Sequence, residues 1–368
     1  MPQWKSIWGQ SHVDIGFLSP TYKDNTMRIS VRNAVSGNQV RLRVSNLEGK
    51  KSYCISEAAV SGQRGEPKTV LFQGKPSVDL QPGEERFSDP AELPIADGEL
   101  ITVSLSFNGA VRSGNNISEH VQCSRKGNFV KAAQFKTVHR NRTASYHDLD
   151  AVIPALSSVE VMTEDDKEVI VCFGDSITQM SRWTKQLAKQ LANTAIVINK
   201  GIGGNRLLSG PFMKMMAMYG RSGLDRFDRD VLNETGATAV ILSIGTNDIG
   251  MVRKEAEMKS FGADALASAY TLLSEKARSH GLKVYATTIL PRMGTTGYLD
   301  FQEKERLAFN RWIRSSKLFD AVFDFDAAVR DSKHPEMMAF PYDSGDHLHP
   351  SALGGEKLAD CVTATLKL

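Results

Sequence analysis

The sequence predicts two domains of different architecture: a jelly-roll-like β-sandwich over residues 1–165, then a three-layer α/β/α domain with a mostly parallel five-stranded sheet over residues 166–368. Three observations support this prediction. The length of 368 residues suits two domains, since one domain usually takes roughly 150 residues. Apolar and polar residues alternate in the first part, whereas short apolar runs alternate with helical stretches in the second.

The first domain is expected to consist of short antiparallel strands. Apolar side chains alternate with arginine, serine or threonine in residues 26–32, 39–45 and 99–107. Turn-forming pairs such as Pro82-Gly83 separate these segments, and no long amphipathic helix interrupts them. Short alternating strands with frequent turn residues are typical of an antiparallel sandwich.

The pattern changes after the acidic, polar residues 163–168. Short apolar runs follow, of the kind that is buried on both faces of a parallel sheet, at residues 169–173, 195–198, 239–243, 284–289 and 321–325. Helical stretches lie between or after these runs, at residues 183–191, 260–280, 303–317 and 351–366. This repeated strand–helix order predicts a parallel sheet that is covered by helices on both faces.

Composition and charge exclude several classes of protein. Basic residues number 45 against 42 acidic ones, and the net charge of +3 gives no basis for binding nucleic acid or an anionic membrane. No stretch approaches the ~18 apolar residues of a membrane span, and the N-terminus lacks the apolar core of a signal peptide. We therefore expect a cytoplasmic protein. The four cysteines form no Cys-x-x-Cys pair, which disfavours a zinc or thioredoxin-type site.

In a parallel α/β sheet, functional residues collect where the strands end. The first apolar run of the second domain ends in Gly174-Asp-Ser-Ile-Thr178, close to the start of a predicted helix. A serine at a helix N-terminus suits a nucleophile, because the backbone N–H groups there favour negative charge. Ser176 is therefore a candidate nucleophile, and the alternative is that Ser176 or Asp175 only caps the helix.

The next two apolar runs end in groups that suit an oxyanion hole. Gly201-Ile-Gly-Gly204 follows the second run, and its lack of side chains lets backbone N–H groups approach a ligand closely. A phosphate cradle is disfavoured because no Gly-Lys-Ser/Thr follows, while a structural turn stays an alternative. Asn247 follows the third run, and its side-chain amide can stabilise an oxyanion, with an Asx turn as the alternative.

An aspartate and a histidine lie three residues apart before the last predicted helix, in Asp346-His-Leu-His349. On one turn, Asp346 can hold the tautomer of His349, and His349 can take the proton of Ser176. The chain order is that of the α/β-hydrolases, but residues 174–178 lack the Gly-x-Ser-x-Gly elbow of that fold. Asp346, His347 and His349 as metal ligands are a weaker alternative, because no further cluster of His or Cys completes a site.

Together, these segments resemble the SGNH hydrolases, also called the GDSL esterase/lipase family. The family is marked by blocks centred on Ser, Gly, Asn and His, which match residues 174–178, the glycine run ending at Gly204, residues 245–248 and residues 346–350. Ile177 stands where the name GDSL has leucine, which is a conservative departure. Residues 226–230 and 342–350 are similar to a bacterial branch that carries a β-rich N-terminal domain.

The resemblance implies a role for each of these residues. It makes Ser176 the nucleophile, His349 the general base and then the acid toward the leaving alcohol, and Asp346 the group that orients His349. It assigns the oxyanion hole to the backbone N–H groups of Ser176 and Gly204 and to the side chain of Asn247. It implies no cofactor and no metal ion, because an activated serine and water suffice.

We expect a serine O-acyl ester hydrolase that works through an acyl-enzyme, most plausibly on acetyl groups of a carbohydrate. A lipase or lysophospholipase, a broad aryl esterase and a catalytically idle glycan-binding protein are the alternatives. The expected partner is a small ester or an acetylated saccharide, without nucleic acid or a membrane span, and the oligomeric state is left open. Candidate substrate-binding residues are Asp175, Asn205 and Arg206, with a surface or ion-pair role as the alternative for Arg206. The N-terminal domain is a candidate for carbohydrate contact, for one wall of the active site or for self-association.

Overall fold

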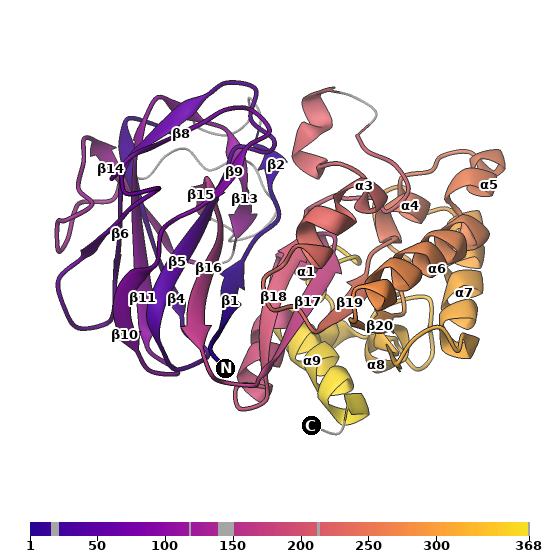
Figure 1. Cartoon of the computed structure of the whole chain (residues 1–368). Helices are drawn as coiled ribbons and strands as arrows, with labels where there is room; N and C mark the ends of the chain where they lie inside the picture. Colours follow the sequence, from indigo (N-terminus) through magenta and orange to yellow (C-terminus); the bar gives the residue numbers. More distant parts are fainter. Residues whose placement is uncertain (16–21, 118, 139–150, 212–213, 367–368) are drawn as a thin grey trace. The chain divides into compact units, whose positions relative to one another are not determined.

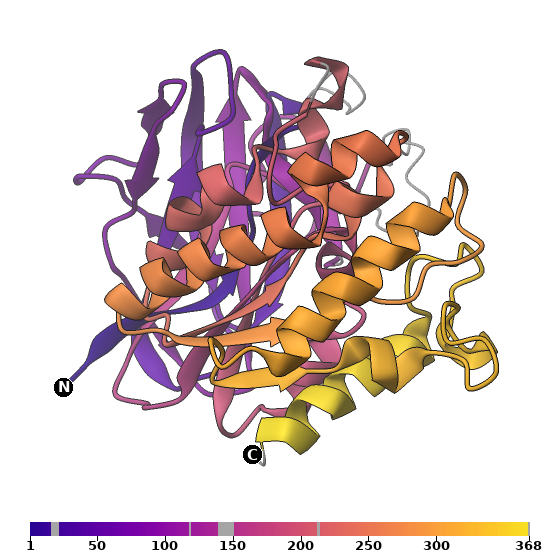
Figure 2. The same cartoon turned by 90° about the vertical axis from the view of Figure 1, so that its right-hand side faces the viewer.

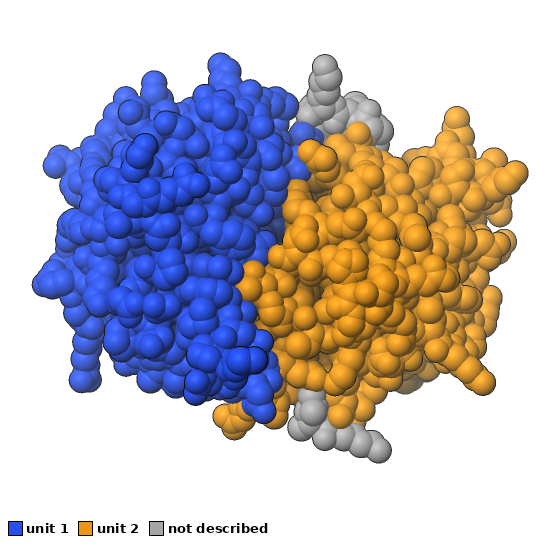
Figure 3. All heavy atoms as spheres, in the orientation of Figure 1, with its two compact units in different colours: residues 1–167, 213–218 blue, residues 168–212, 219–368 orange. Residues whose placement is uncertain are grey.

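The computed structural model of the chain describes residues 1–15, 22–117, 119–138, 151–211 and 214–366 (Figure 1). The chain divides into two compact units (Figure 3). Unit 1 comprises residues 1–167 and 213–218, and unit 2 comprises residues 168–212 and 219–368.

Unit 1 is built from antiparallel sheets, as the sequence predicts. Its strands are β1 (Gln3–Gly9), β2 (Val13–Asp14), β3 (Tyr22–Lys23), β4 (Asn25–Arg32), β5 (Gly37–Ser45), β6 (Tyr53–Ser61), β7 (Lys68–Val70), β8 (Val78–Leu80), β9 (Glu85–Phe87), β10 (Ala91–Ile95), β11 (Leu100–Asn108), β12 (Ala110–Val111), β13 (Ser113–Ile117), β14 (Val121–Lys126), β15 (Ala151–Pro154) and β16 (Leu156–Thr163). The larger sheets have the orders β14-β4-β11-β6-β7, with β8 beside β6, and β1-β16-β5-β10, with β9 beside β5. Smaller sheets pair β12 with β3, and β13 with β15 and β2.

The alternating residues of unit 1 supply its core. The predicted segments at 26–32, 39–45 and 99–107 correspond to β4, β5 and β11. In β5 the side chains of Val40, Leu42 and Val44 are fully buried, and so are those of Ile101, Val103 and Leu105 in β11. Because every second side chain of a strand points to the same face, this period of two places all six on the core faces of their sheets.

Unit 2 has a parallel sheet with the order β18-β17-β19-β20-β21. Its strands are β17 (Glu168–Gly174), β18 (Ala195–Gly201), β19 (Ala239–Ser243), β20 (Lys283–Thr287) and β21 (Ala321–Phe323). Its helices include α1 (Ser176–Gln179), α2 (Thr184–Gln190), α3 (Gly223–Phe227), α4 (Thr246–Gly250), α5 (Met258–Phe261), α6 (Ala263–Ser279), α7 (Asp300–Ser315), α8 (Phe325–Val329) and α9 (Ala352–Leu366). This is the predicted five-stranded α/β/α fold.

Two apolar clusters hold the layers of unit 2 together. The first cluster contains Phe173 of the sheet, Tyr270 of α6 and Phe309 of α7. The rings of Tyr270 and Phe309 meet edge to face, with 5.1 Å between their centroids. On the opposite face, residues of α2, α8 and α9 form the second cluster. Figure 2 shows α6 and α7 in orange and α9 in yellow beside the sheet. None of the helices in the described part of the chain is long and apolar enough to cross a membrane.

One predicted helix and two predicted strands differ from the observed elements. The helix expected at residues 260–280 is divided at Gly262, whose backbone is extended. A side chain there would place its Cβ 2.4 Å from the carboxylate of Glu305, which accepts the N–H of Ala263. Strand β20 ends at Thr287, two residues before the end of the apolar run. Strand β21 ends at Phe323, also two residues early, because Asp324 caps α8.

The strand order brings the candidate segments together. β17 lies between β18 and β19, and all strands of the sheet run in the same direction. The segments that follow β17, β18 and β19 therefore lie side by side at one edge of the sheet, where α/β proteins build their sites.

Candidate active site

Ser176 is the first residue of α1 and is separated by Asp175 alone from Gly174, the last residue of β17. Asp175 caps the helix, and its Oδ1 accepts the N–H of Ile177 at 3.0 Å. A side chain at Gly174 would place its Cβ 2.1 Å from Oγ1 of Thr178, so the sharp passage from strand to helix needs glycine there. The serine is partly exposed, while its neighbours on both sides are buried.

His349 joins the serine to an aspartate. Its Nε2 lies 2.8 Å from Oγ of Ser176, and its Nδ1 lies 2.6 Å from Oδ2 of Asp346. With the proton on Nδ1 donated to Asp346, Nε2 carries the lone pair that can accept the serine proton. The imidazole is largely shielded, since 13% of the His349 side chain is exposed.

Asp346 is held as a carboxylate by the turn that it belongs to. Burial opposes its charge, but hydrogen bonds from the side chain and the backbone of His349 outweigh burial and hold the pKa of Asp346 below its usual range. Its Oδ1 accepts the N–H groups of Leu348 and His349 at 3.0 and 2.9 Å, and the hydroxyl of Ser344 at 3.0 Å. The negative charge that supports the imidazole is thus fixed in place.

His347 makes a separate pair of its own. Its Nδ1 lies 2.6 Å from Oδ2 of Asp343, and its backbone has a φ of 60°. His347 and His349 therefore each use Nδ1 on a different carboxylate. Among the described residues, no group of three or more His, Cys, Asp or Glu side chains could hold a metal ion.

The glycine run after β18 packs against the start of α1. A side chain at Gly201 would place its Cβ 2.2 Å from the backbone nitrogen of Gln179, and Gly204 has a φ of +70°. Ile202 donates its N–H to the carbonyl of Gly174 at 3.1 Å, which ties the run to the end of β17. Within the described part of the chain, the N–H groups of Ser176 and Gly204 have no hydrogen-bond acceptor and stay available to a ligand.

Asn247 lies in the first turn of α4, after Gly245, whose φ of +127° suits glycine. Its Nδ2 donates to the backbone carbonyl of Asn205 at 3.0 Å. One hydrogen of the amide is used to orient the side chain, and the second is left for a ligand. The residue is 8% exposed, so this donor sits in a site with little water.

Asp175 and Asn205, two of the candidate substrate-binding residues, are each 1% exposed. The amide of Asn205 donates to the carbonyls of Tyr219 and Arg221, at 2.6 and 2.7 Å. Burial raises the pKa of Asp175 to about 6, against the lowering effect of the Ile177 N–H. Both side chains therefore have hydrogen-bond partners within the protein.

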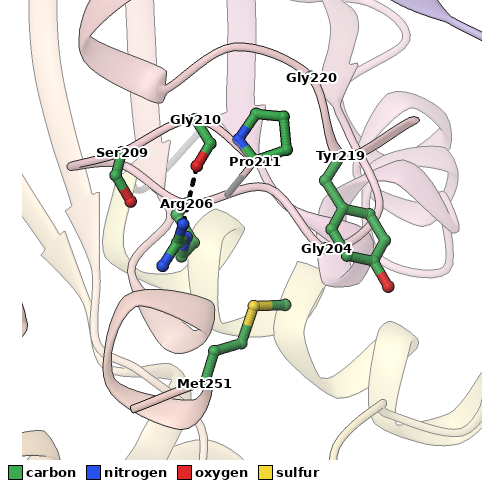
Figure 4. Close-up of a pocket in the computed structure, with 8 residues that line it drawn as sticks. All are labelled: Gly204, Arg206, Ser209, Gly210, Pro211, Tyr219, Gly220 and Met251. Atoms are coloured by element: carbon green, nitrogen blue, oxygen red, sulfur yellow. Dashed lines mark hydrogen bonds between the residues drawn. The ribbon is translucent and has the colours of Figure 1, made fainter. Parts of the chain in front are cut away.

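Arg206, the third candidate, is half-buried and borders a cavity that begins at Gly204. Its Nη2 donates to the carbonyl of Gly210 at 2.7 Å, and its guanidinium faces the ring of Phe261 at 5.5 Å. Figure 4 shows the side chain together with Tyr219 and Met251 in the wall of this cavity. Of the three candidates, Arg206 alone lines this cavity.

Arg226 belongs to the residues 226–230 that carry part of the resemblance, but no role was predicted for it. It has no exposed surface and donates to the carbonyls of Gly174 and Lys200, at 2.8 and 2.9 Å, and to Oδ1 of Asn205 at 2.9 Å. Burial lowers its pKa to about 10, while the ion pair with Asp230 at 2.8 Å opposes that effect. The available signal was the spacing of Arg226 and Asp230, which places both on one helical face.

Asp248, which follows the oxyanion candidate, was also missed. Its two carboxylate oxygens accept the N–H groups of Leu207 and Leu208, both at 2.8 Å. Burial raises its pKa to about 7, against the effect of those two hydrogen bonds. It connects α4 to the chain that leaves the glycine run.

The family model of the GDSL-like lipase/acylhydrolase family matches residues 172–357. No curated protein matches the chain. Similar solved structures include a GDSL-like lipase from Bacteroides thetaiotaomicron, with 20% identity, a TM-score of 0.39 and coverage of 54% of this chain and 86% of the lipase. Another is a mutant acetyl-xylooligosaccharide esterase from Geobacillus, with 19% identity, a TM-score of 0.42 and coverage of 54% and 93%. Because the family model spans half of the chain, the protein belongs to the GDSL-like lipase/acylhydrolase family of ester hydrolases.

Proposed function

We propose that the protein is a serine esterase that removes short acyl groups, in particular acetyl groups, from a carbohydrate alcohol through an acyl-enzyme. The observation that carries the proposal is the chain of contacts from Ser176 through His349 to Asp346, at 2.8 and 2.6 Å. A nucleophile, a base and a group that orients the base are the parts that acyl transfer needs.

Acylation begins when Nε2 of His349 takes the proton of Ser176 and Oγ attacks the carbonyl carbon of the ester. The tetrahedral intermediate places its negative oxygen among the N–H groups of Ser176 and Gly204 and the amide of Asn247. His349 then gives its proton to the leaving alcohol oxygen, and the carbon–oxygen bond of the ester breaks. Asp346 stabilises the imidazolium that exists between these two proton transfers.

Deacylation repeats the sequence with water. His349 takes a proton from the water molecule, whose oxygen attacks the acyl carbon, and the same donors hold the second oxyanion. Collapse releases the carboxylic acid, and His349 returns its proton to Oγ of Ser176. No other group is needed to balance the reaction.

The near-balance of charge in the chain, +3 overall, suits a neutral ester better than a polyanion.

Ser176→Ala tests the nucleophile. The kcat for acetate release from acetylated saccharides and for hydrolysis of an aryl acetate is expected to fall by about 10⁶-fold. Ester turnover that survives this change would remove Ser176 from the mechanism. A wild-type protein that binds glycans and shows no Ser176-dependent turnover would instead be an idle glycan-binding protein.

A series of esters of increasing acyl length tests the substrate class. The proposed function predicts the highest kcat/KM on acetyl esters. A higher kcat/KM on octanoyl esters would identify a lipase or lysophospholipase type of activity. Hydrolysis of an aryl acetate, with no activity on any acetylated saccharide, would identify a broad aryl esterase.

A further inference from the structure

We propose that Tyr270 is a positioning residue of the esterase site, and that its hydroxyl holds the turn between β19 and α4 and thereby sets the place of the Asn247 amide. This inference rests on the proposed function, because it gives Tyr270 a part in stabilising the oxyanion of acyl transfer. Tyr270 lies in α6 and has no exposed surface. Its hydroxyl reaches the site through the backbone of Ile244.

The Tyr270 hydroxyl bonds to both backbone groups of one residue. It donates to the carbonyl of Ile244 at 2.7 Å and accepts the N–H of Ile244 at 3.2 Å. Strand β19 ends at Ser243, so Ile244 is the first residue past the end of the strand. Inside a sheet, neighbouring strands supply the donor and the acceptor that a residue needs. Here one side chain supplies both, because a hydroxyl can donate and accept at the same time.

The glycine that follows Ile244 makes this contact important for the site. Gly245 has a φ of +127° and leads from the strand into α4. Glycine has little conformational preference of its own, so the peptide group between Ile244 and Gly245 would be free to rotate if nothing held it. The Tyr270 hydroxyl holds the oxygen of that peptide group. Asn247 follows Gly245 by two residues, and the place of its amide therefore depends on this turn.

The Tyr270 ring is itself fixed by other aromatic side chains. It meets the rings of Phe309, Trp312 and Phe319 edge to face, with centroid distances of 5.1, 6.5 and 6.2 Å. Burial raises the pKa of Tyr270 above its usual range, so the hydroxyl keeps the proton that it donates. The turn thus bonds to a side chain that packing holds in one place.

Other bonds connect α4 to the segment that follows the glycine run. Nδ2 of Asn247 donates to the carbonyl of Asn205 at 3.0 Å, and the two carboxylate oxygens of Asp248 accept backbone N–H groups of the same segment. Tyr270 instead connects the residue before α4 to α6. We therefore expect α4 to stay folded when the Tyr270 hydroxyl is removed, with the Asn247 amide displaced.

Tyr270→Phe tests the proposal, because it removes the hydroxyl and keeps the ring. We expect kcat on an aryl acetate to fall by about 10- to 100-fold and KM to change by less than about 2-fold, since a displacement of about 1 Å in a catalytic group can cost of the order of 10²-fold in rate. The affinity for a boronic acid that mimics the tetrahedral intermediate should fall together with kcat. A folded variant with the wild-type kcat overturns the proposal.

The double variant Tyr270→Phe/Asn247→Ala separates a positioning role from a merely structural one. If Tyr270 acts through the Asn247 amide, loss of its hydroxyl costs little once that amide is gone. The kcat of the double variant should then lie within about 2-fold of the kcat of Asn247→Ala. Losses that multiply in the double variant would show that Tyr270 acts by another route and would overturn the proposal.

Tyr53→Phe is the matched control. Tyr53 is also buried, and its hydroxyl donates to the carbonyl of Ser45 at 2.8 Å within unit 1. Loss of a buried hydrogen bond is expected to lower the unfolding temperature of both variants, whereas kcat should fall in Tyr270→Phe alone. An equal loss of kcat in Tyr53→Phe would assign the effect to general destabilisation and overturn the proposal.

A crystal structure of the wild-type protein with a boronic acid bound to Ser176 keeps the proposal testable if Tyr270→Phe does not fold. The Asn247 amide should lie within hydrogen-bond distance of an oxygen of the adduct, with the Tyr270 hydroxyl still bound to Ile244. An amide that points elsewhere, or a hydroxyl that has left Ile244, overturns the role of Tyr270 and leaves Ser176 untouched. Failure of the proposed function gives a different result, namely ester turnover that persists in Ser176→Ala or is absent from the wild type, and the role of Tyr270 falls with it.

Discussion

The guanidinium of Arg226 donates from Nη2 to the carbonyl oxygen of Gly174 at 2.8 Å, inside a part of unit 2 without solvent exposure. The same side chain binds the carbonyl of Lys200 at the end of β18 and the amide oxygen of Asn205. Asn205 in turn accepts a hydrogen bond from Asn247 through its backbone carbonyl. One buried cation thus links the three segments that carry the proposed oxyanion donors.

Arg226→Lys is therefore expected to lower kcat far more than it changes KM. Lysine retains the charge but not the fork of donors, so it cannot hold all these acceptors at once. A displacement of about 1 Å in a catalytic group can cost of the order of 10²-fold in rate. The affinity for a boronic acid that mimics the tetrahedral intermediate should fall with kcat, while the secondary structure seen by circular dichroism is retained.

Arg278→Lys is the matched control, since Arg278 is 44% exposed and pairs with Asp320 on the surface. Both its kcat and its boronic acid affinity should stay at wild-type values. An Arg226→Lys protein that is folded and fully active would show that the link does not position the donors.

Asn247→Ala is expected to reduce kcat by about 10²- to 10³-fold with little change in KM, because the amide acts on the charge that forms in the transition state. The measurement is steady-state kinetics on an aryl acetate. Asn247→Ser serves as a partial replacement that keeps a donor, and it should recover part of the loss. A larger effect on KM than on kcat would indicate a role in ground-state binding instead.

The Asp346–His349 pair predicts the effect of removing the orienting carboxylate. The pKa of Asp346 is held below its usual range, so Asp346 stays a carboxylate where most esterase assays are done. Asp346→Asn should lower kcat by an order of 10⁴, as loss of the orienting carboxylate does in serine hydrolases.

The same depressed pKa has a consequence for stability. A carboxyl group with a lower pKa in the fold than in the unfolded chain stabilises the fold above its unfolded pKa of about 3.9, and this contribution is lost as the pH falls. The thermal unfolding temperatures of the wild type and of Asp346→Asn should therefore converge below pH ~4. A difference that grows toward acid pH would contradict this sign.

Asp248 predicts the opposite pH dependence. Burial raises its pKa to about 7, so the folded chain binds a proton that the unfolded chain has released. The stabilising effect is present below the unfolded pKa of about 3.9 and is lost as the pH rises toward 7. Asp248→Asn should remove this loss, so that its unfolding temperature declines less than that of the wild type between pH 5 and 8.

Much of the fold was predictable because it depends on local patterns. The alternation of Val40, Leu42 and Val44 with polar residues indicated a strand, and β5 buries those three side chains. The apolar run at 239–243 coincides with β19. The break at Gly262 was not predictable from the helical pattern, because it depends on a hydrogen bond from Ala263 to Glu305 on another helix.

The order of residues along the chain is enough to show which reactive groups follow which strands, and in a parallel sheet that order brings Ser176, Gly204 and Asn247 to one edge. Three relationships become visible in the folded chain alone: His349 lies 2.8 Å from Ser176, Asn205 is buried, and Arg226 joins the ends of β17 and β18. These relationships connect residues that are far apart in the chain. A local pattern records the preference of each segment for helix or strand, whereas contacts of this kind exist only once the segments are packed.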